Sequence, residues 1–157
     1  MLLMFAREDT DDKTFFSRYD TAHPMSSHVE RPFELDGMTW PTIEHYFQAM
    51  KFTDEALRQR INQAPTPEQA SKIGSKWYRR PRRDWKKIQT VVMTRAIYVS
   101  AKCYPELAQA LLESRGQTLI ENDAYDYFWG CGRDKRGENQ YGQVLMNVRD
   151  KLFAEQA

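Results

Sequence analysis

The most informative stretch of this 157-residue chain is Trp40-Pro-Thr-Ile-Glu-His-Tyr-Phe-Gln-Ala-Met-Lys-Phe52. Pro41 and Thr42 suit the start of a helix, because proline is favoured in the first helical turn and threonine caps free amide groups. We predict a helix that begins there and continues to about Asn62. Projected at about 100 degrees per residue, its apolar residues form one broad face and leave a narrow polar arc.

That polar arc consists of Glu44, Gln48 and Lys51, at positions i, i+4 and i+7. Side chains at this spacing lie in one row on a helix. The row is either the solvated edge of an amphipathic helix or the lining of a groove between aromatic side chains. In a partly dry groove a carboxylate or an amine shifts its pKa toward neutrality, which suits a general acid or base and a nucleophilic lysine. The row is therefore a candidate site.

The flanking segments predict one mainly α domain with a small β-sheet, spanning residues 1–157. Upstream, Asp36-Gly37 lies between two short apolar runs, which is typical of a tight hairpin. Residues 1–32 are expected to be irregular apart from a short strand at Leu2–Phe5. Downstream, capping residues, prolines, glycines and helical spacing predict further elements. These are helices from Thr66 to Gly74, from Trp85 to about Cys103, from Pro105 to Gly116 and from about Asn139 to Phe153, and a strand at Thr118–Glu121.

A second candidate segment is the loop Asp126-Tyr-Phe-Trp129-Gly-Cys-Gly132. It combines a carboxylate, a flat aromatic surface and flexible backbone, so it has the means to stack a base and orient a sugar. In the alternative interpretation Trp129 fills the core and the glycines make turns. The glycine and lysine spacings of a P-loop or a dinucleotide-binding motif are missing.

The segment Lys76–Arg83 gathers five cations around two aromatic residues. It is either a phosphate or nucleic-acid contact or a solvated connector between helices. Arg83 is the cation most expected to contribute to a site, because it lies where the next helix begins.

Composition narrows the function classes. The 23 basic and 22 acidic residues nearly cancel, so no overall field favours a nucleic-acid coat or an anionic membrane as partner. Cys103 and Cys131 lack the spacing of a zinc site or a redox pair, and a reducing compartment fits them best. Charged residues from Arg7 onward come too early for a membrane-spanning segment, so a soluble, cytoplasmic protein is expected. No histidine pair or Gly-x-Ser-x-Gly motif favours metal hydrolysis or a serine triad.

Taken in order, these blocks resemble the YbiA/NADAR family over roughly residues 15–153. The resemblance is carried by Phe33-x-Leu-x-Gly37, the stretch 40–52, Arg83-Asp-Trp85 with Val92-Met93, Leu119-Ile-Glu121, Asp126-x-x-Trp-Gly130, Asn139-x-x-Gly142, Leu145-Met146 and Val148-Arg149. It implies a YbiA-like fold, cleavage of ribosyl–nitrogen bonds, and neither a metal nor an organic cofactor. Two departures stand out: Arg18 occupies a position where the family usually carries asparagine, and the stretch Thr21–Arg31 is longer than usual.

The reaction that the resemblance implies predicts roles for the polar residues. Cleavage of a ribosylamine builds positive charge on the anomeric carbon and negative charge on the leaving nitrogen. Glu44 would protonate the nitrogen or activate water, and Asp126 would hold the ribose hydroxyls or support the developing cation. Lys51 would attack the opened sugar as an amine, or pair with a phosphate.

The expected binding residues surround these three. Trp129 and Tyr46 would sandwich the base or the ribose, while Gln48 and Asn139 would hydrogen-bond the sugar or the phosphate. Arg18 and Arg83 are the candidates for the phosphate itself.

Three functions remain open. The first is an N-glycosidase that cleaves phosphoribosylamino-pyrimidine intermediates of riboflavin biosynthesis into ribose 5-phosphate and free base. The second is a hydrolase that removes ADP-ribose from modified guanine in nucleic acid, and the third is a non-catalytic module that binds ADP-ribose or ribose phosphate. The first and third take a small phosphoribosyl or ADP-ribosyl molecule, only the second engages nucleic acid, and none involves a membrane.

Overall fold

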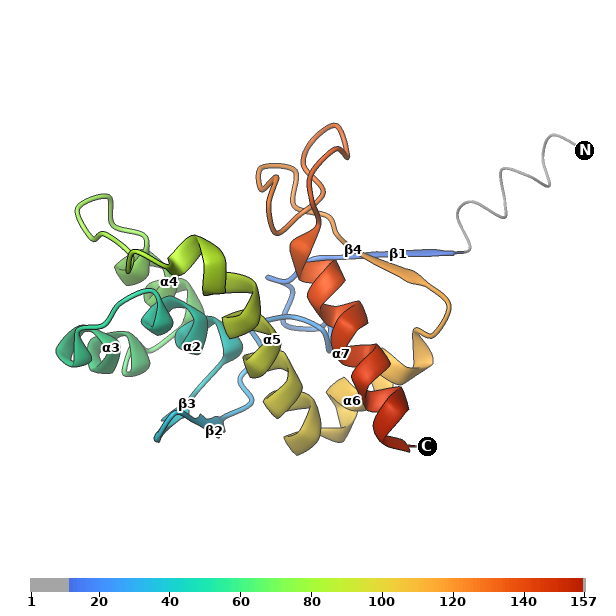
Figure 1. The fold of residues 1–157 in the computed structure, drawn as a ribbon, viewed down its shortest axis with the longest axis horizontal. Coiled ribbons are helices and arrows are strands. Elements are labelled where there is room, and N and C mark those ends of the chain that lie inside the picture. Colours follow the sequence, from blue (N-terminus) through green and yellow to red (C-terminus); the bar gives the residue numbers. More distant parts are fainter. Residues whose placement is uncertain (1–11, 157) are drawn as a thin grey trace, which may run out of the picture.

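The computed structural model describes residues 12–156, which form six helices and two small two-stranded sheets (Figure 1). The mainly α prediction is confirmed. The predicted strand at Leu2–Phe5 lies outside the described residues. The elements are β1 (Lys13–Phe16), β2 (Phe33–Leu35), β3 (Met38–Trp40), α2 (Ile43–Met50), α3 (Glu55–Asn62), α4 (Pro67–Gly74), α5 (Trp85–Cys103), α6 (Pro105–Glu113), β4 (Thr118–Glu121) and α7 (Gln140–Gln156).

Helix α2 begins as the sequence predicts and ends earlier than it predicts. Thr42 caps it, with its hydroxyl accepting the His45 backbone N–H at 3.1 Å. The prediction of one helix to Asn62 is wrong, because the chain breaks after α2 and Asp54 starts a separate helix, α3. The Asp54 carboxylate accepts the Ala56 amide at 2.9 Å, so a second N-cap competes with continued apolar periodicity and prevails.

The hairpin β2–β3 forms where Asp36-Gly37 predicts it. The strands are antiparallel, with Phe33 opposite Trp40. Both turn residues have positive φ, 53° at Asp36 and 81° at Gly37, as the favoured two-residue hairpin turns require. The hairpin places the start of α2 against the core.

The second sheet joins distant parts of the chain. Strand β1 pairs in parallel with β4, with Lys13 opposite Thr118 and Phe16 opposite Glu121. The prediction that residues 1–32 contain no strand after Phe5 is therefore wrong for β1. Of this four-residue strand only Phe16 is buried, so local pattern gives little indication of a pairing made with a distant segment.

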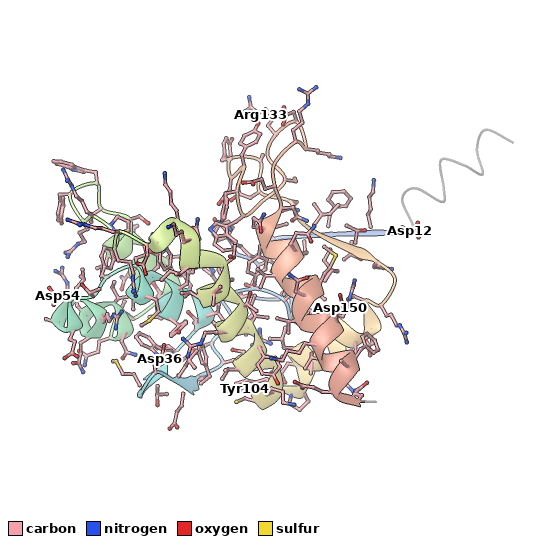
Figure 2. The ribbon with its side chains drawn as sticks, viewed as in Figure 1. Asp12, Asp36, Asp54, Tyr104, Arg133 and Asp150 are labelled. Carbon is pink, nitrogen blue, oxygen red and sulfur yellow. The ribbon has the colours of Figure 1, made fainter. Side chains whose placement is uncertain are left out.

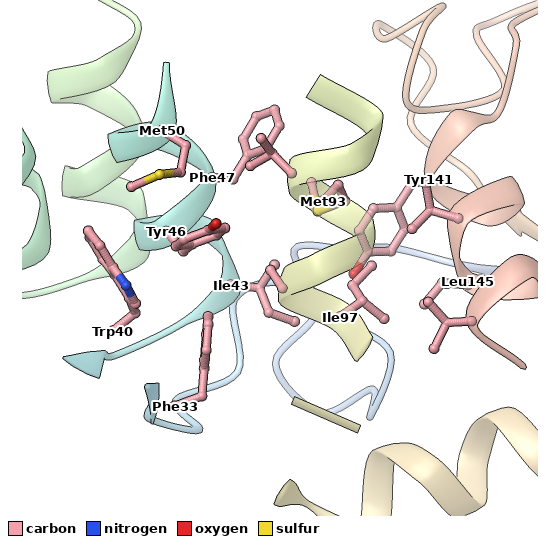
Figure 3. Packing of buried hydrophobic residues seen from close by; sticks show 14 of the residues in the cluster. Phe33, Trp40, Ile43, Tyr46, Phe47, Met50, Met93, Ile97, Tyr141 and Leu145 are labelled. Atoms are coloured by element: carbon pink, nitrogen blue, oxygen red, sulfur yellow. The ribbon is translucent and has the colours of Figure 1, made fainter. Parts of the chain in front are cut away.

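Helix α5 lies at the centre of the molecule, with α2 on one side and α7 on the other (Figures 1 and 3). Ile43, Tyr46 and Phe47 of α2 extend toward Met93 and Ile97 of α5, and Tyr141 and Leu145 of α7 close the opposite side (Figure 3). Because other elements surround α2, each of its eight residues is buried, the polar ones included. The solvated-edge interpretation is thus excluded for Glu44 and Gln48, while Lys51, which follows the helix, is half-buried.

No helix within residues 12–156 is both long and apolar enough to cross a membrane.

Candidate active site

A pocket of about 320 Å³ opens where α2, α4 and the start of α5 meet the loop after β4. Arg133, labelled in Figure 2, marks the outer tip of that loop. The pocket is lined by Arg18, Tyr19, Glu44, Phe47, Gln48, Lys51, Ser71, Ser75, Trp85, Gln89, Met93, Asp126 and Trp129. The structure thus brings together six of the predicted site residues, which are Arg18, Glu44, Gln48, Lys51, Asp126 and Trp129.

Helix α2 supplies the polar row of the pocket. Gln48 Nε2 donates to Glu44 Oε1 at 2.7 Å, which fixes the carboxylate along the helix. Glu44 is 7 % exposed, and its backbone N–H donates to the Ser27 carbonyl at 3.1 Å. The row is therefore held from within α2 and from the segment before it.

The Lys51 amine lies at the end of this row, with Nζ 6.0 Å from the centre of the Phe47 ring. Burial lowers the pKa of Lys51, and the charge of Glu44 opposes this shift without cancelling it. A larger fraction of Lys51 is consequently the neutral amine near physiological pH than for an exposed lysine. Only the neutral amine is nucleophilic.

Asp126 is held as an ion. Arg18 Nη2 donates to its Oδ2 at 2.9 Å, and the amides of Phe128 and Trp129 donate to its Oδ1 at 2.9 and 2.8 Å. Burial alone would raise the pKa of Asp126, but these hydrogen bonds and the Arg18 charge lower it below its usual value. Asp126 therefore suits the stabilisation of a cation and not the donation of a proton.

Trp129 belongs to both the core and the pocket wall. Its ring meets Phe47 edge-on at 5.3 Å between centroids and Phe128 at 4.9 Å. It is buried and still lines the cavity. The two sequence interpretations of this tryptophan thus describe different faces of one side chain.

Three predicted binding residues lie outside the pocket lining. Tyr46 is 0 % exposed and packs on Trp40, at 5.4 Å between centroids, in the core. Asn139 has a φ of 51° and fastens the start of α7 to β4, donating to the Leu119 carbonyl and accepting the Glu121 amide at 2.9 Å each. Arg83 is exposed on the α4–α5 connection. The structure thus does not bring these three residues into the pocket, and their substrate contacts stay predictions.

Replacement of Tyr46 by phenylalanine tests whether its hydroxyl contacts the substrate or only stabilises the fold. The Tyr46 hydroxyl donates to Asp36 Oδ2 at 2.7 Å and accepts a longer hydrogen bond from Arg95 Nη1 at 3.3 Å. The variant loses both bonds and about 1 kcal/mol of unfolding free energy. We expect a Tm lower by about 2–4 °C and an unchanged KM, measured by thermal unfolding and steady-state kinetics. A rise in KM without a change in Tm would restore Tyr46 to the binding site.

Several pocket residues escaped the sequence prediction. Trp85, Gln89 and Met93 share one face of α5 at intervals of four, and Ser71 and Ser75 do the same on α4 and its cap. Spacing of four residues places side chains on one face of a helix. It identifies a pocket lining only when the element opposite that face is known.

Gly74 allows α4 to approach the polar row. A Cβ at Gly74 would lie 2.2 Å from Gln48 Oε1, closer than atoms can pack. The absence of a side chain there leaves room for the Gln48 amide that holds Glu44.

The basic segment behaves mainly as a connector. Arg82 pairs with Asp84 at 2.6 Å. Asp84 stands at the N-cap position of α5 and makes no side-chain cap bond there. The Arg82 backbone N–H donates to the Lys51 carbonyl at 2.7 Å. Through that bond the segment supports the end of α2.

The sequence matches a known protein family. The family model of the NADAR domain matches residues 4–153. The chain belongs to the NADAR family. N-glycosidase YbiA of Shigella flexneri is 36 % identical over 141 residues, which cover 90 % of this chain and 88 % of that protein.

Other NADAR relatives extend this result. The riboflavin biosynthesis protein PYRR of Zea mays, named as chloroplastic, is 33 % identical over 160 residues, covering 92 % of this chain and 26 % of that longer protein. The NMR structure of the Escherichia coli protein YbiA superposes with a TM-score of 0.83 at 34 % identity, covering 92 % of this chain and 88 % of that one. The YbiA-like fold implied by the sequence is confirmed.

Proposed function

We propose that this NADAR chain is an N-glycosidase that hydrolyses phosphoribosylamino-pyrimidine intermediates of riboflavin biosynthesis to ribose 5-phosphate and free base. Its 36 % sequence identity to N-glycosidase YbiA supports a hydrolase that acts on N-glycosyl compounds. Its sequence similarity to PYRR supports a substrate from riboflavin biosynthesis. One observation carries the proposal: a buried carboxylate, an ionised aspartate and a lysine of lowered pKa line a single pocket.

Each carboxylate of the pocket fits one demand of the reaction. Glu44, fixed by Gln48, protonates the leaving nitrogen or activates the attacking water. Asp126, already ionised, holds the ribose hydroxyls and supports the cation that develops at the anomeric carbon. Overall, the water oxygen bonds to the anomeric carbon and the base departs with a proton.

Lys51 gives the reaction a covalent route. In this route its neutral amine adds to the anomeric carbon of the opened sugar, the base leaves with a proton, and water later hydrolyses the resulting imine. In the alternative role Lys51 remains protonated and pairs with the substrate phosphate.

Arg18 is the better placed of the two predicted phosphate contacts. It lines the pocket, and its Nη1 is buried without a hydrogen-bond partner among residues 12–156. A buried donor of this kind is costly unless a ligand or water satisfies it. Arg83 has no comparable position.

The decisive experiment offers the purified protein two substrates, a phosphoribosylamino-pyrimidine and ADP-ribosyl-guanosine. Released base and sugar phosphate are measured by mass spectrometry. Turnover of the first substrate supports the proposal, and turnover of the second alone replaces it with removal of ADP-ribose. Tight binding of ADP-ribose without product would make the chain a binding module.

One feature favours the second candidate, removal of ADP-ribose from modified guanine in nucleic acid. Trp77 of the basic segment is 92 % exposed, and the segment joins two helices that line the pocket. Exposed aromatics among cations suit stacking on unpaired bases. Under this candidate, affinity for modified DNA falls steeply with salt.

A further inference from the structure

Glu121 is a buried carboxylate outside the pocket lining. It ends β4 and is 0 % exposed. Its Oε2 accepts the Arg18 backbone N–H at 2.5 Å, while its Oε1 is buried without a hydrogen-bond partner among residues 12–156. Burial of a carboxyl group lowers the stability of the folded protein. Packing alone therefore does not explain a glutamate at this position.

The residue that Glu121 holds is connected to both pocket carboxylates. The Arg18 side chain binds Asp126 directly. The Arg18 carbonyl accepts the Ser27 N–H at 3.1 Å, and the Ser27 carbonyl in turn accepts the Glu44 N–H at 3.1 Å. The Glu121 carboxylate thus holds the backbone of Arg18, the central residue in a series of hydrogen bonds that links Asp126 to Glu44.

We propose that Glu121 is a positioning residue, which holds the Arg18 backbone and thereby sets the placement of Asp126 and Glu44 at the pocket. It does not touch the substrate. A carboxylate is a stronger acceptor for the Arg18 N–H than a neutral acid or amide, so its ionised form holds this turn most firmly. A displacement of about 1 Å in a reacting group costs about 10²-fold in rate.

The surroundings of Glu121 shift its titration well above that of an exposed glutamate. Burial raises the pKa of Glu121 to about 7, with the Arg18 N–H and charge opposing the shift. The charge of Asp123 adds to the shift, and the Asp123 backbone opposes it. Tyr141 of α7 also has a pKa raised by burial, and the charge of Glu121 adds to that shift. Acidification through pH 7 therefore protonates Glu121 and weakens its bond to Arg18.

Two variants separate positioning from general stability. Glu121→Gln keeps an acceptor oxygen but cannot ionise, and Glu121→Ala removes the acceptor. We expect kcat to fall by about 10²-fold in Glu121→Ala, and Glu121→Gln to recover at least a tenth of the wild-type value. The wild-type kcat should decrease below about pH 7 more steeply than that of Glu121→Gln. Glu34→Gln, an exposed glutamate on β2, serves as the control and should match wild type.

A second measurement is independent of turnover, because the kinetic arm rests on the proposed function. In NMR titrations of the wild type, the Glu121 carboxyl carbon and the Arg18 backbone amide should shift together with a midpoint near 7, and the Arg18 amide of Glu121→Gln should stay constant. A Glu121 midpoint near 4.5, or an Arg18 amide that ignores it, overturns the proposal even if Glu121→Ala fails to fold. A folded Glu121→Ala protein with wild-type kcat also overturns it. Lack of turnover in the wild type contradicts the proposed function alone, and the titration still decides the role of Glu121.

Discussion

Replacement of Glu44 by glutamine is expected to lower kcat by about 10³-fold. The amide keeps the shape of the side chain and an oxygen that accepts the Gln48 Nε2 hydrogen bond. It loses the capacity to exchange a proton with the leaving nitrogen or with water. Steady-state kinetics on the phosphoribosylamino-pyrimidine measures the loss, and thermal unfolding verifies that the fold is retained.

A matched control for this variant is present in the next helix. Glu55 lies in the first turn of α3 as Glu44 lies in the first turn of α2, but it is exposed to solvent. Glu55→Gln should therefore retain the wild-type kcat. If Glu44→Gln kept more than a tenth of the wild-type kcat, Glu44 would not be the acid or base of the reaction.

Replacement of Lys51 by alanine is expected to reduce kcat by about 10³-fold or more if the amine acts covalently. Lys51→Arg distinguishes the two roles, because arginine keeps the positive charge and does not form an imine. In the covalent route both variants are inactive, and borohydride with substrate reduces a wild-type adduct that mass spectrometry locates at Lys51. Lys72→Ala, an exposed lysine on α4, should behave as wild type.

The covalent route through Lys51 predicts the direction in which kcat changes with pH. Burial lowers the pKa of Lys51, so the nucleophilic amine becomes available at lower pH than for an exposed lysine. The covalent route therefore gives a kcat that rises with pH as Lys51 loses its proton. If Lys51→Arg retains kcat and no adduct forms, the residue is a fixed cation that pairs with the phosphate.

Local sequence predicted the part of the site that lies on one helix. The spacing of Glu44, Gln48 and Lys51 fixed their common row, because helical geometry repeats within a few residues. It did not distinguish a residue that faces the pocket from one that faces the core. Tyr46 and Phe47 belong to the same broad apolar face, yet Phe47 lines the cavity and Tyr46 packs on Trp40.

The remainder of the site depends on contacts between distant segments. Arg18 reaches Asp126 across 108 residues, and the burial of Glu121 follows from the pairing of β4 with β1. Neither contact leaves a periodic pattern in the sequence. The early end of α2 had a local signal in Asp54, but the apolar periodicity that continues past it favoured one longer helix.

The parallel pairing of β1 with β4 affects how the nascent chain folds during translation. The Arg18 amide meets its Glu121 partner 103 residues later, so the amino-terminal segment emerges long before the strand that will receive it. Pairing over such a separation carries a large loop-closure cost and is slow compared with helix formation. Glu44, Gln48 and Lys51 are thus synthesised well before Glu121 and Asp126, and the pocket is completed only after β4 and the loop that follows it have left the ribosome.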